Sequence, residues 1–133
     1  MTDAIRVVRI RSRADIHNAV HAIRELAAAL GMSAGSAAAI STAASELVTN
    51  VVKYAPPGRM SYLGKKRRSQ PGIEVVVEDS GPGIENIEEA LKDNVSTGGS
   101  LGLGLPGAKR LVDEFEIASS LEGGTRVRIV KWG

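Results

Sequence analysis

Two long stretches with helical spacing follow one another early in this chain, and most of what comes after them has the spacing of strands. In residues 14–31 apolar side chains recur every three or four positions up to Gly31, a natural helix stop. A second helical stretch begins after Ser33 or Ser36, either of which could cap it, and ends at a Pro-Pro-Gly sequence.

The strand pattern predicts a sheet for these helices to cover. Residues 4–12 predict a strand covered on one face, and residues 73–79 give the strongest strand signal, bounded by Pro-Gly and Gly-Pro-Gly. Further strands are expected in 60–72, with a loose turn, and in 116–121 and 125–132, and shorter helices within 84–93 and over 106–115. This order predicts an α+β fold, a two-layer α/β sandwich whose mixed sheet has helices on one face.

The composition fits one globular domain over residues 1–133. A hydrophobic content of 43% supplies one core, and the lack of cysteine excludes disulfides and thiolate metal sites. The net charge of +2 is too small for a dedicated nucleic-acid binder, and the basic run 65–68 is interpreted as a solvated hairpin tip rather than a nucleic-acid or membrane patch. No signal peptide is evident and no apolar run approaches the roughly 20 residues that span a bilayer, so we expect a soluble, cytoplasmic protein.

A carboxylate and a carboxamide stand one turn apart in the second helical stretch. Glu46 and Asn50 share one helix face, next to the apolar Leu47 and Val51, so we expect both at the edge of the buried face. A metal ion with a polyphosphate would give them partners, because Asn50 can coordinate Mg²⁺ and Glu46 can accept a proton from an attacking hydroxyl. Lys53, on the next turn, could reach a phosphate. The alternative is a surface pair at the shoulder of the helix.

The strongest predicted strand ends in a carboxylate followed by glycines. Asp79 ends it, and Gly81 and Gly83 let the backbone turn sharply and approach a ligand closely. A carboxylate held there can accept a hydrogen bond from an exocyclic amine such as that of adenine. An ordinary Asp-Ser-Gly turn after a strand has the same residues, and stays open as the alternative.

A glycine-rich segment, residues 96–104, leads into the helix predicted to start near Pro106. Its candidate ligand-binding residues are Gly98, Gly99, Gly102, Leu103 and Gly104. Such a segment presents free backbone N–H groups and the positive end of the helix dipole to an anion. The leucines among the glycines argue against a simple flexible surface loop.

Other familiar site patterns are incomplete. Gly102, Gly104 and Gly107 have the spacing of a dinucleotide-binding fingerprint, but no strand precedes them and no βαβ unit surrounds them. The phosphate-loop pattern fails because no Gly-Lys-Ser/Thr sequence is present. His17 and His21 stand four positions apart without an obvious third ligand, so we expect partly exposed helix residues.

Taken in order, these three segments and the later Gly124-Thr125 pair resemble the GHKL ATPase/kinase superfamily and its Bergerat nucleotide-binding fold. Each motif alone is weak, but the four occur in the superfamily's order between residues 4 and 132. Within it, the chain is similar to small bacterial serine kinases of the RsbT type, the switch kinases of the stressosome. The similar stretches are 42–55, 78–91, 96–117 and 123–132. The anti-sigma kinases RsbW and SpoIIAB resemble the chain more distantly.

The resemblance implies a role for each matching residue. Asn50 would ligate Mg²⁺, and Glu46 would be the general base toward a substrate serine hydroxyl. Asp79 would bind the adenine amino group, with Gly81 and Gly83 shaping the pocket floor.

The same resemblance implies how the two ends of the nucleotide are held. Gly102 and Gly104 would hold the phosphates through their backbone amides, with Lys53 as a weaker phosphate candidate. Thr125 would support the adenine side beside Asp79.

The implied activity is that of an ATP-dependent protein serine/threonine kinase that uses Mg²⁺. The implied acceptor is a serine or threonine on a STAS-domain antagonist or scaffold protein, and the released kinase would bind and activate a PPM-type phosphatase. One alternative is an anti-sigma factor with serine kinase activity that sequesters a sigma factor. Another is a non-catalytic adaptor that uses nucleotide as a structural ligand.

Overall fold

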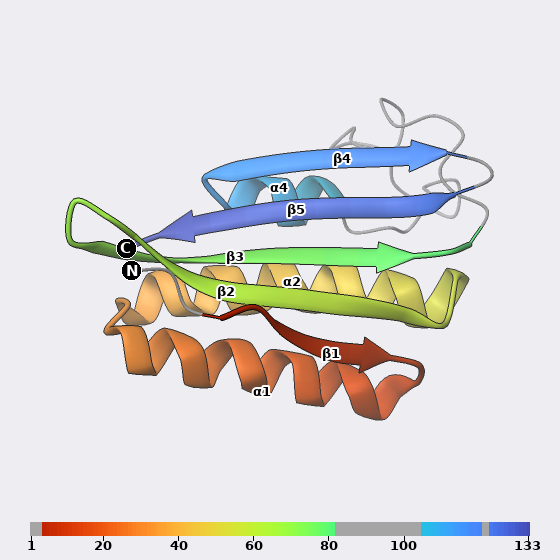
Figure 1. Cartoon of the computed structure of the whole chain (residues 1–133), viewed down its shortest axis with the longest axis horizontal. Coiled ribbons are helices and arrows are strands. Elements are labelled where there is room, and N and C mark those ends of the chain that lie inside the picture. The colour runs from red at the N-terminus through yellow and green to blue at the C-terminus, as the bar shows by residue number, and fades with distance from the viewer. Residues whose placement is uncertain (1–3, 82–104, 121–122) are drawn as a thin grey trace.

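The computed structural model of the chain describes residues 4–81, 105–120 and 123–133 (Figure 1). Its strands are β1 (Arg6–Ile10), β2 (Gly58–Arg67), β3 (Gln70–Asp79), β4 (Glu114–Ser120) and β5 (Gly124–Trp132). Its helices are α1 (Arg13–Leu30), α2 (Ala34–Tyr54) and α4 (Leu105–Leu111). The short helix expected within 84–93 and the glycine-rich segment 96–104 lie outside the described residues.

The five strands form one sheet in the order β1-β2-β3-β5-β4, and the three helices lie against one face of it (Figure 1). The predicted two-layer α+β sandwich is therefore confirmed. The expectation of a mixed sheet is corrected, because every strand pair in the described part of the chain is antiparallel. Strands β3 and β4 do run in the same direction, but the β4–β5 hairpin inserts β5 between them.

The ends of α1 and α2 are fixed by short-range hydrogen bonds. The Asp15 carboxylate accepts the backbone N–H of Arg11 at 2.8 Å, and this bond holds the pKa of Asp15 below its ordinary value. Gly31 ends α1 with a φ of 79°. Of the two candidate caps of α2, Ser33 is the one used, since its Oγ accepts the N–H of Ser36 at 3.1 Å.

No helix in the described ranges has both the length and the apolar character that crossing a bilayer requires.

The core between the helices and the sheet is mainly aliphatic. Helix α2 packs mainly over β3 and β5, and α1 lies alongside it. The largest fully buried apolar side chains include Ile10, Ile23, Ile40, Met60, Ile73, Leu105 and Ile129. Burying one such side chain contributes about 1.5–3 kcal/mol, so this shared core holds α2 firmly against the sheet.

The predicted helix over 106–115 is too long at its C-terminal end. Helix α4 stops at Leu111, and Phe115 lies in β4, opposite Ile129 of β5. The backbone N–H of Asp113 donates to the carbonyl oxygen of Val130 at 2.9 Å, which starts the β ladder. Strand pairing overrides the helical spacing because it lets Phe115 pack against the core.

The basic run 65–68 is at a hairpin tip, as predicted. Strands β2 and β3 are joined through Arg68 and Ser69, which both have positive φ angles, 48° and 73°. That conformation matches the twist of the flanking strands in two-residue hairpins. The guanidinium of Arg67 lies over the ring of Trp132, 4.3 Å from its centroid, so part of this basic surface is used within the chain.

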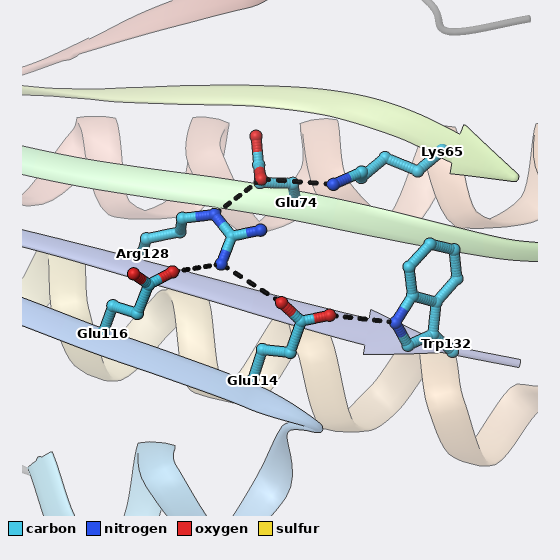
Figure 2. Close-up of polar contacts among 6 residues, drawn as sticks. All are labelled: Lys65, Glu74, Glu114, Glu116, Arg128 and Trp132. Carbon is cyan, nitrogen blue, oxygen red and sulfur yellow. Dashed lines mark hydrogen bonds and ion pairs between the residues drawn. The ribbon is translucent and has the colours of Figure 1, made fainter. Parts of the chain in front are cut away.

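The face of the sheet opposite the helices carries a polar network centred on Arg128 (Figure 2). The carboxylates that pair with it are those of Glu74 at 2.7 Å, Glu114 at 3.2 Å and Glu116. The hydrogen bond from Trp132 Nε1, and then the pairing with Arg128, lower the pKa of Glu114. Burial would lower the pKa of Arg128, but its carboxylate partners outweigh burial and raise it.

Candidate functional site

The C-terminal half of α2 carries three of the predicted site residues. The buried face of this part of α2 is formed by Leu47, Val48 and Val51. Asn50 lies at the edge of that face and is half-buried, as expected, whereas Glu46 is exposed. Each helical residue advances about 100° around the axis, and this places Glu46 farther from the core than Asn50. The helix therefore presents Glu46 to solvent beside a partly covered carboxamide.

Asp79 is held in a fixed orientation at the end of β3. Its Oδ1 accepts two backbone hydrogen bonds, from the N–H of Gly81 at 2.9 Å and from the N–H of Thr125 at 3.3 Å. Its Oδ2 accepts no hydrogen bond from any residue that the structure describes. One carboxylate oxygen thus anchors the side chain, and the other can accept further hydrogen bonds.

Two glycines allow the segments around Asp79 to come together. A Cβ atom on Gly124, whose φ is +82°, would lie 2.1 Å from the carbonyl oxygen of Asp79. A Cβ atom on Gly81 would lie 2.4 Å from the Cβ of Ala55, which caps the C-terminus of α2. The absence of side chains here lets β5 and the end of α2 both contact the end of β3.

The predicted residue Thr125 lies beside Asp79 because β3 and β5 are neighbours in the sheet (Figure 1). Its hydroxyl is within 2.9 Å of the hydroxyl of Ser119, its cross-strand partner on β4. The sequence analysis includes Gly124 in a family motif without predicting its contact with Asp79, and it assigns no role to Ser119 or Ala55. The pairing of β5 with its neighbours identifies Ser119 and Gly124, and the contact between Gly81 and the end of α2 identifies Ala55.

Some of the remaining candidate residues lie outside the described ranges, and the structure places the others on α1 and α2. The predicted residues Gly83, Gly98, Gly99, Gly102, Leu103 and Gly104 lie outside the described residues. Lys53 is exposed and borders a groove between α1 and α2, which His17 also lines. His21 is exposed, as expected, and pairs with Glu25. The described residues hold no group of three or more His, Cys, Asp or Glu side chains that could bind a metal ion.

The sequence around Glu46, Asn50, Asp79 and Thr125 matches a known protein family. Residues 11–131 match the family described as histidine kinase-like ATPase domain. The chain belongs to this family. The matched range includes Glu46, Asn50, Asp79 and Thr125.

Two relatives agree with the family match, and one solved structure agrees with the fold. The serine/threonine-protein kinase RsbT of Bacillus subtilis (strain 168) is 41% identical over 125 residues, 94% of each chain. The anti-sigma F factor of Heyndrickxia coagulans is 33% identical over 96 residues, 68% of this chain and 65% of that protein. The histidine kinase domain of an Erythrobacter litoralis blue-light activated histidine kinase aligns with a TM-score of 0.50 and 22% identity. That alignment covers 89% of this chain and 59% of the solved one, and it supports the fold alone.

The predicted family resemblance and enzyme class are both confirmed. The chain is a histidine kinase-like ATPase domain of the protein serine/threonine kinase class.

Proposed function

We propose that this chain is a cytoplasmic serine kinase in a bacterial stress-signalling switch, and that residues 1–133 form its one kinase domain. The observation that carries the nucleotide site is the orientation of Asp79: two backbone N–H groups hold Oδ1, and no donor among the described residues bonds to Oδ2. An ionised carboxylate accepts hydrogen bonds only, so its natural partner is a donor such as the amino group of adenine. Gly81 and Gly83 would shape the floor of this pocket, and Thr125 would support its adenine side.

The donor groups on α2 fit a magnesium ion that arrives with the nucleotide. Asn50 offers a half-buried amide oxygen, and the described residues provide no cluster of carboxylates or histidines for a metal held by protein alone. Mg²⁺ suits this situation because it is usually bound by one or two protein oxygens together with substrate phosphates. Bound there, the ion would neutralise the developing charge on the transferred phosphoryl group.

The phosphates would be held by backbone amides of the glycine-rich segment. The residues assigned to this contact are Gly98, Gly99, Gly102, Leu103 and Gly104. Lys53 is the weaker phosphate candidate, because its side chain borders the groove toward α1.

Glu46 would act as the general base. As the serine oxygen forms its bond to the γ-phosphorus, the bond to the ADP oxygen breaks and the hydroxyl proton passes to the Glu46 carboxylate. The exposure of Glu46 supports this role, since the base must meet a hydroxyl that belongs to another protein. Asn50, one turn away, would keep the nucleotide phosphates next to it.

The partners we propose are STAS-domain antagonist or scaffold proteins, which carry the acceptor serine or threonine. After phosphorylating them, the kinase would be released to bind and activate a PPM-type phosphatase. The 41% identity to RsbT over 94% of both chains supports this assignment.

The second candidate is an anti-sigma factor with serine kinase activity that sequesters a sigma factor. The anti-sigma F factor of Heyndrickxia coagulans, 33% identical over 68% of this chain, favours it. Size-exclusion chromatography with a purified sigma subunit separates the two: a stable complex, with no complex between this chain and STAS-domain proteins, would select the anti-sigma factor.

The nucleotide site is tested by replacing Asp79 with its amide. In Asp79→Asn the amide oxygen can still accept the two backbone N–H groups that bond to Oδ1. The amide nitrogen, however, replaces Oδ2 and is a hydrogen-bond donor, so it cannot accept a hydrogen bond from the adenine amino group. We expect calorimetry to show ATP affinity lowered about 10- to 100-fold, the worth of a hydrogen bond to a charged group. Glu78→Gln, one position earlier and paired with Arg59, is the matched control and should bind ATP normally. Unchanged affinity in Asp79→Asn would refute the assignment.

A further inference from the structure

A groove separates the first turns of α1 from the last turns of α2. It has a volume of about 260 Å³ and is lined by Arg13, Ile16, His17, Thr49, Val52 and Lys53. Ile16 and Val52 are half-buried and pack against the core, which gives the groove an apolar floor. The volume is below the roughly 300–1,000 Å³ of pockets for drug-sized ligands, so it suits one or two side chains rather than a nucleotide.

The rim of this groove carries two cationic side chains, Arg13 and Lys53, that no carboxylate in the described part of the chain neutralises. Arg13, His17 and Lys53 are exposed, and none of them makes an ion pair with a residue that the structure describes. On the outer face of the sheet the situation differs, because Arg126 and Arg128 both pair with carboxylates. An apolar floor below unpaired cationic groups is complementary to a peptide with one apolar side chain flanked by carboxylates.

The groove adjoins the residues to which we assign the chemistry. Thr49 lies three positions after Glu46, and Lys53 lies three positions after Asn50, all on α2. Side chains at this spacing are neighbours on a helix surface, with Cβ atoms about 5–6 Å apart. A peptide seated in the groove would therefore run past Glu46.

We propose that this groove, the α1–α2 groove, is the docking site for an acidic segment of the acceptor protein, with an apolar side chain of that segment in contact with Ile16 and Val52. The proposal rests on the proposed function, because it requires a protein acceptor. Docking here raises the local concentration of the acceptor hydroxyl near Glu46 and leaves the Asp79 end of the site to the nucleotide. Recognition of the acceptor is then separate from recognition of ATP.

Nuclear magnetic resonance of the ¹⁵N-labelled whole chain tests the groove directly. The probe is a heptapeptide with a central leucine flanked by glutamates, compared with one flanked by lysines and one with a central alanine. We expect the acidic leucine peptide to shift the amide signals of Ile16, His17, Thr49 and Val52 and to leave those of Asp79 and Thr125 in place. Equal binding of the lysine peptide, or shifts elsewhere only, would overturn the proposal.

A charge reversal on α1 supplies the second test. Arg13→Glu should weaken the acidic peptide about three- to tenfold, and Arg24→Glu, the same change on the same helix outside the groove, should not. Glutamate in the first turn of a helix is favourable, so Arg13→Glu should keep its stability. In phosphotransfer assays with a STAS-domain acceptor, Arg13→Glu should raise KM for the acceptor and leave ATP affinity unchanged. An equal loss in Arg24→Glu would overturn the assignment to the groove.

Two further measurements identify other occupants. If vesicles of phosphatidylglycerol sediment the wild-type chain but not Arg13→Glu, the groove serves a lipid surface and the proposal is wrong. A titration of the same labelled sample with ATP and Mg²⁺ separates the two hypotheses: shifts at Asp79 and Thr125 without any peptide binding would reject the groove and keep the nucleotide site. Peptide binding without nucleotide shifts would reject the proposed function and leave the groove as a peptide site.

Discussion

Gly124 touches Asp79 so closely that a single added carbon would not fit: a Cβ atom on Gly124 would lie 2.1 Å from the carbonyl oxygen of Asp79. This contact brings the start of β5 against the end of β3, and the next residue, Thr125, donates its N–H to Asp79 Oδ1. The orientation of the candidate adenine-binding carboxylate therefore depends on a residue 45 positions later in the chain, counted from 79 to 124.

Gly124→Ala should disrupt both the fold and the site. Alanine disfavours the φ of +82° and its Cβ would collide with backbone, so we expect a loss of about 1–3 kcal/mol in the free energy of unfolding, measured in urea. ATP affinity should fall as well. Gly35→Ala is the control, because that position in α2 is open and alanine favours a helix; it should be neutral or slightly stabilising. Normal stability of Gly124→Ala would contradict the contact.

Glu46→Gln should remove phosphoryl transfer and keep the fold. A general base contributes about 10²–10⁴-fold to rate, and the neutral amide cannot take the hydroxyl proton. Because Glu46 is exposed, the free energy of unfolding should change by less than about 0.5 kcal/mol. Single-turnover phosphorylation of a STAS-domain protein, with calorimetry for ATP binding, measures both effects. A wild-type rate of transfer would exclude Glu46 as the base.

Arg128→Met should destabilise the chain by about 1–3 kcal/mol. The methionine keeps most of the apolar stem, but Glu74, Glu114 and Glu116 lose the cation that they share (Figure 2). Added salt should restore part of the loss, because it screens the repulsion among the carboxylates. The matched control is Arg126→Met, whose side chain is 55% exposed and pairs with Glu78 at 3.6 Å; its effect should stay within about 0.5 kcal/mol.

The free energy of unfolding should fall at acidic pH, because Glu114 becomes protonated and loses its stabilising contacts. Its pKa is lower in the folded chain than the ordinary value of 4.5, so its contribution is fully present above pH 4.5 and is lost as the pH falls through the folded-state pKa. The urea midpoint, followed by the fluorescence of the single tryptophan, should drop below pH 4.5. In Glu114→Gln this part of the pH dependence should disappear. An unchanged acid profile would show that the Trp132 hydrogen bond does not hold in solution.

Much of the fold could be predicted because its signals are local. The spacing of apolar residues, the cap at Ser33 and the stop at Gly31 act within a few positions of where they occur. The hairpin strands were found for the same reason. The errors were the boundary near Phe115 and the expectation of a mixed sheet, and both depend on which strand lies beside which. Strand neighbours are chosen by long-range packing, which periodicity does not encode.

In the candidate site, too, the features that depend on local spacing could be predicted, and the contacts between distant segments could not. The sequence by itself determined that Glu46 and Asn50 share a helix face, that Asp79 ends a strand before glycines, and that the motifs occur in the order of one family. Only the tertiary structure decided that Gly124 and Thr125 lie against Asp79, that Glu46 faces solvent, and that Arg13 and Lys53 line one groove. The reason is physical: spacing along a helix or strand is set by backbone geometry, whereas contacts between distant segments form only when a shared core packs them together.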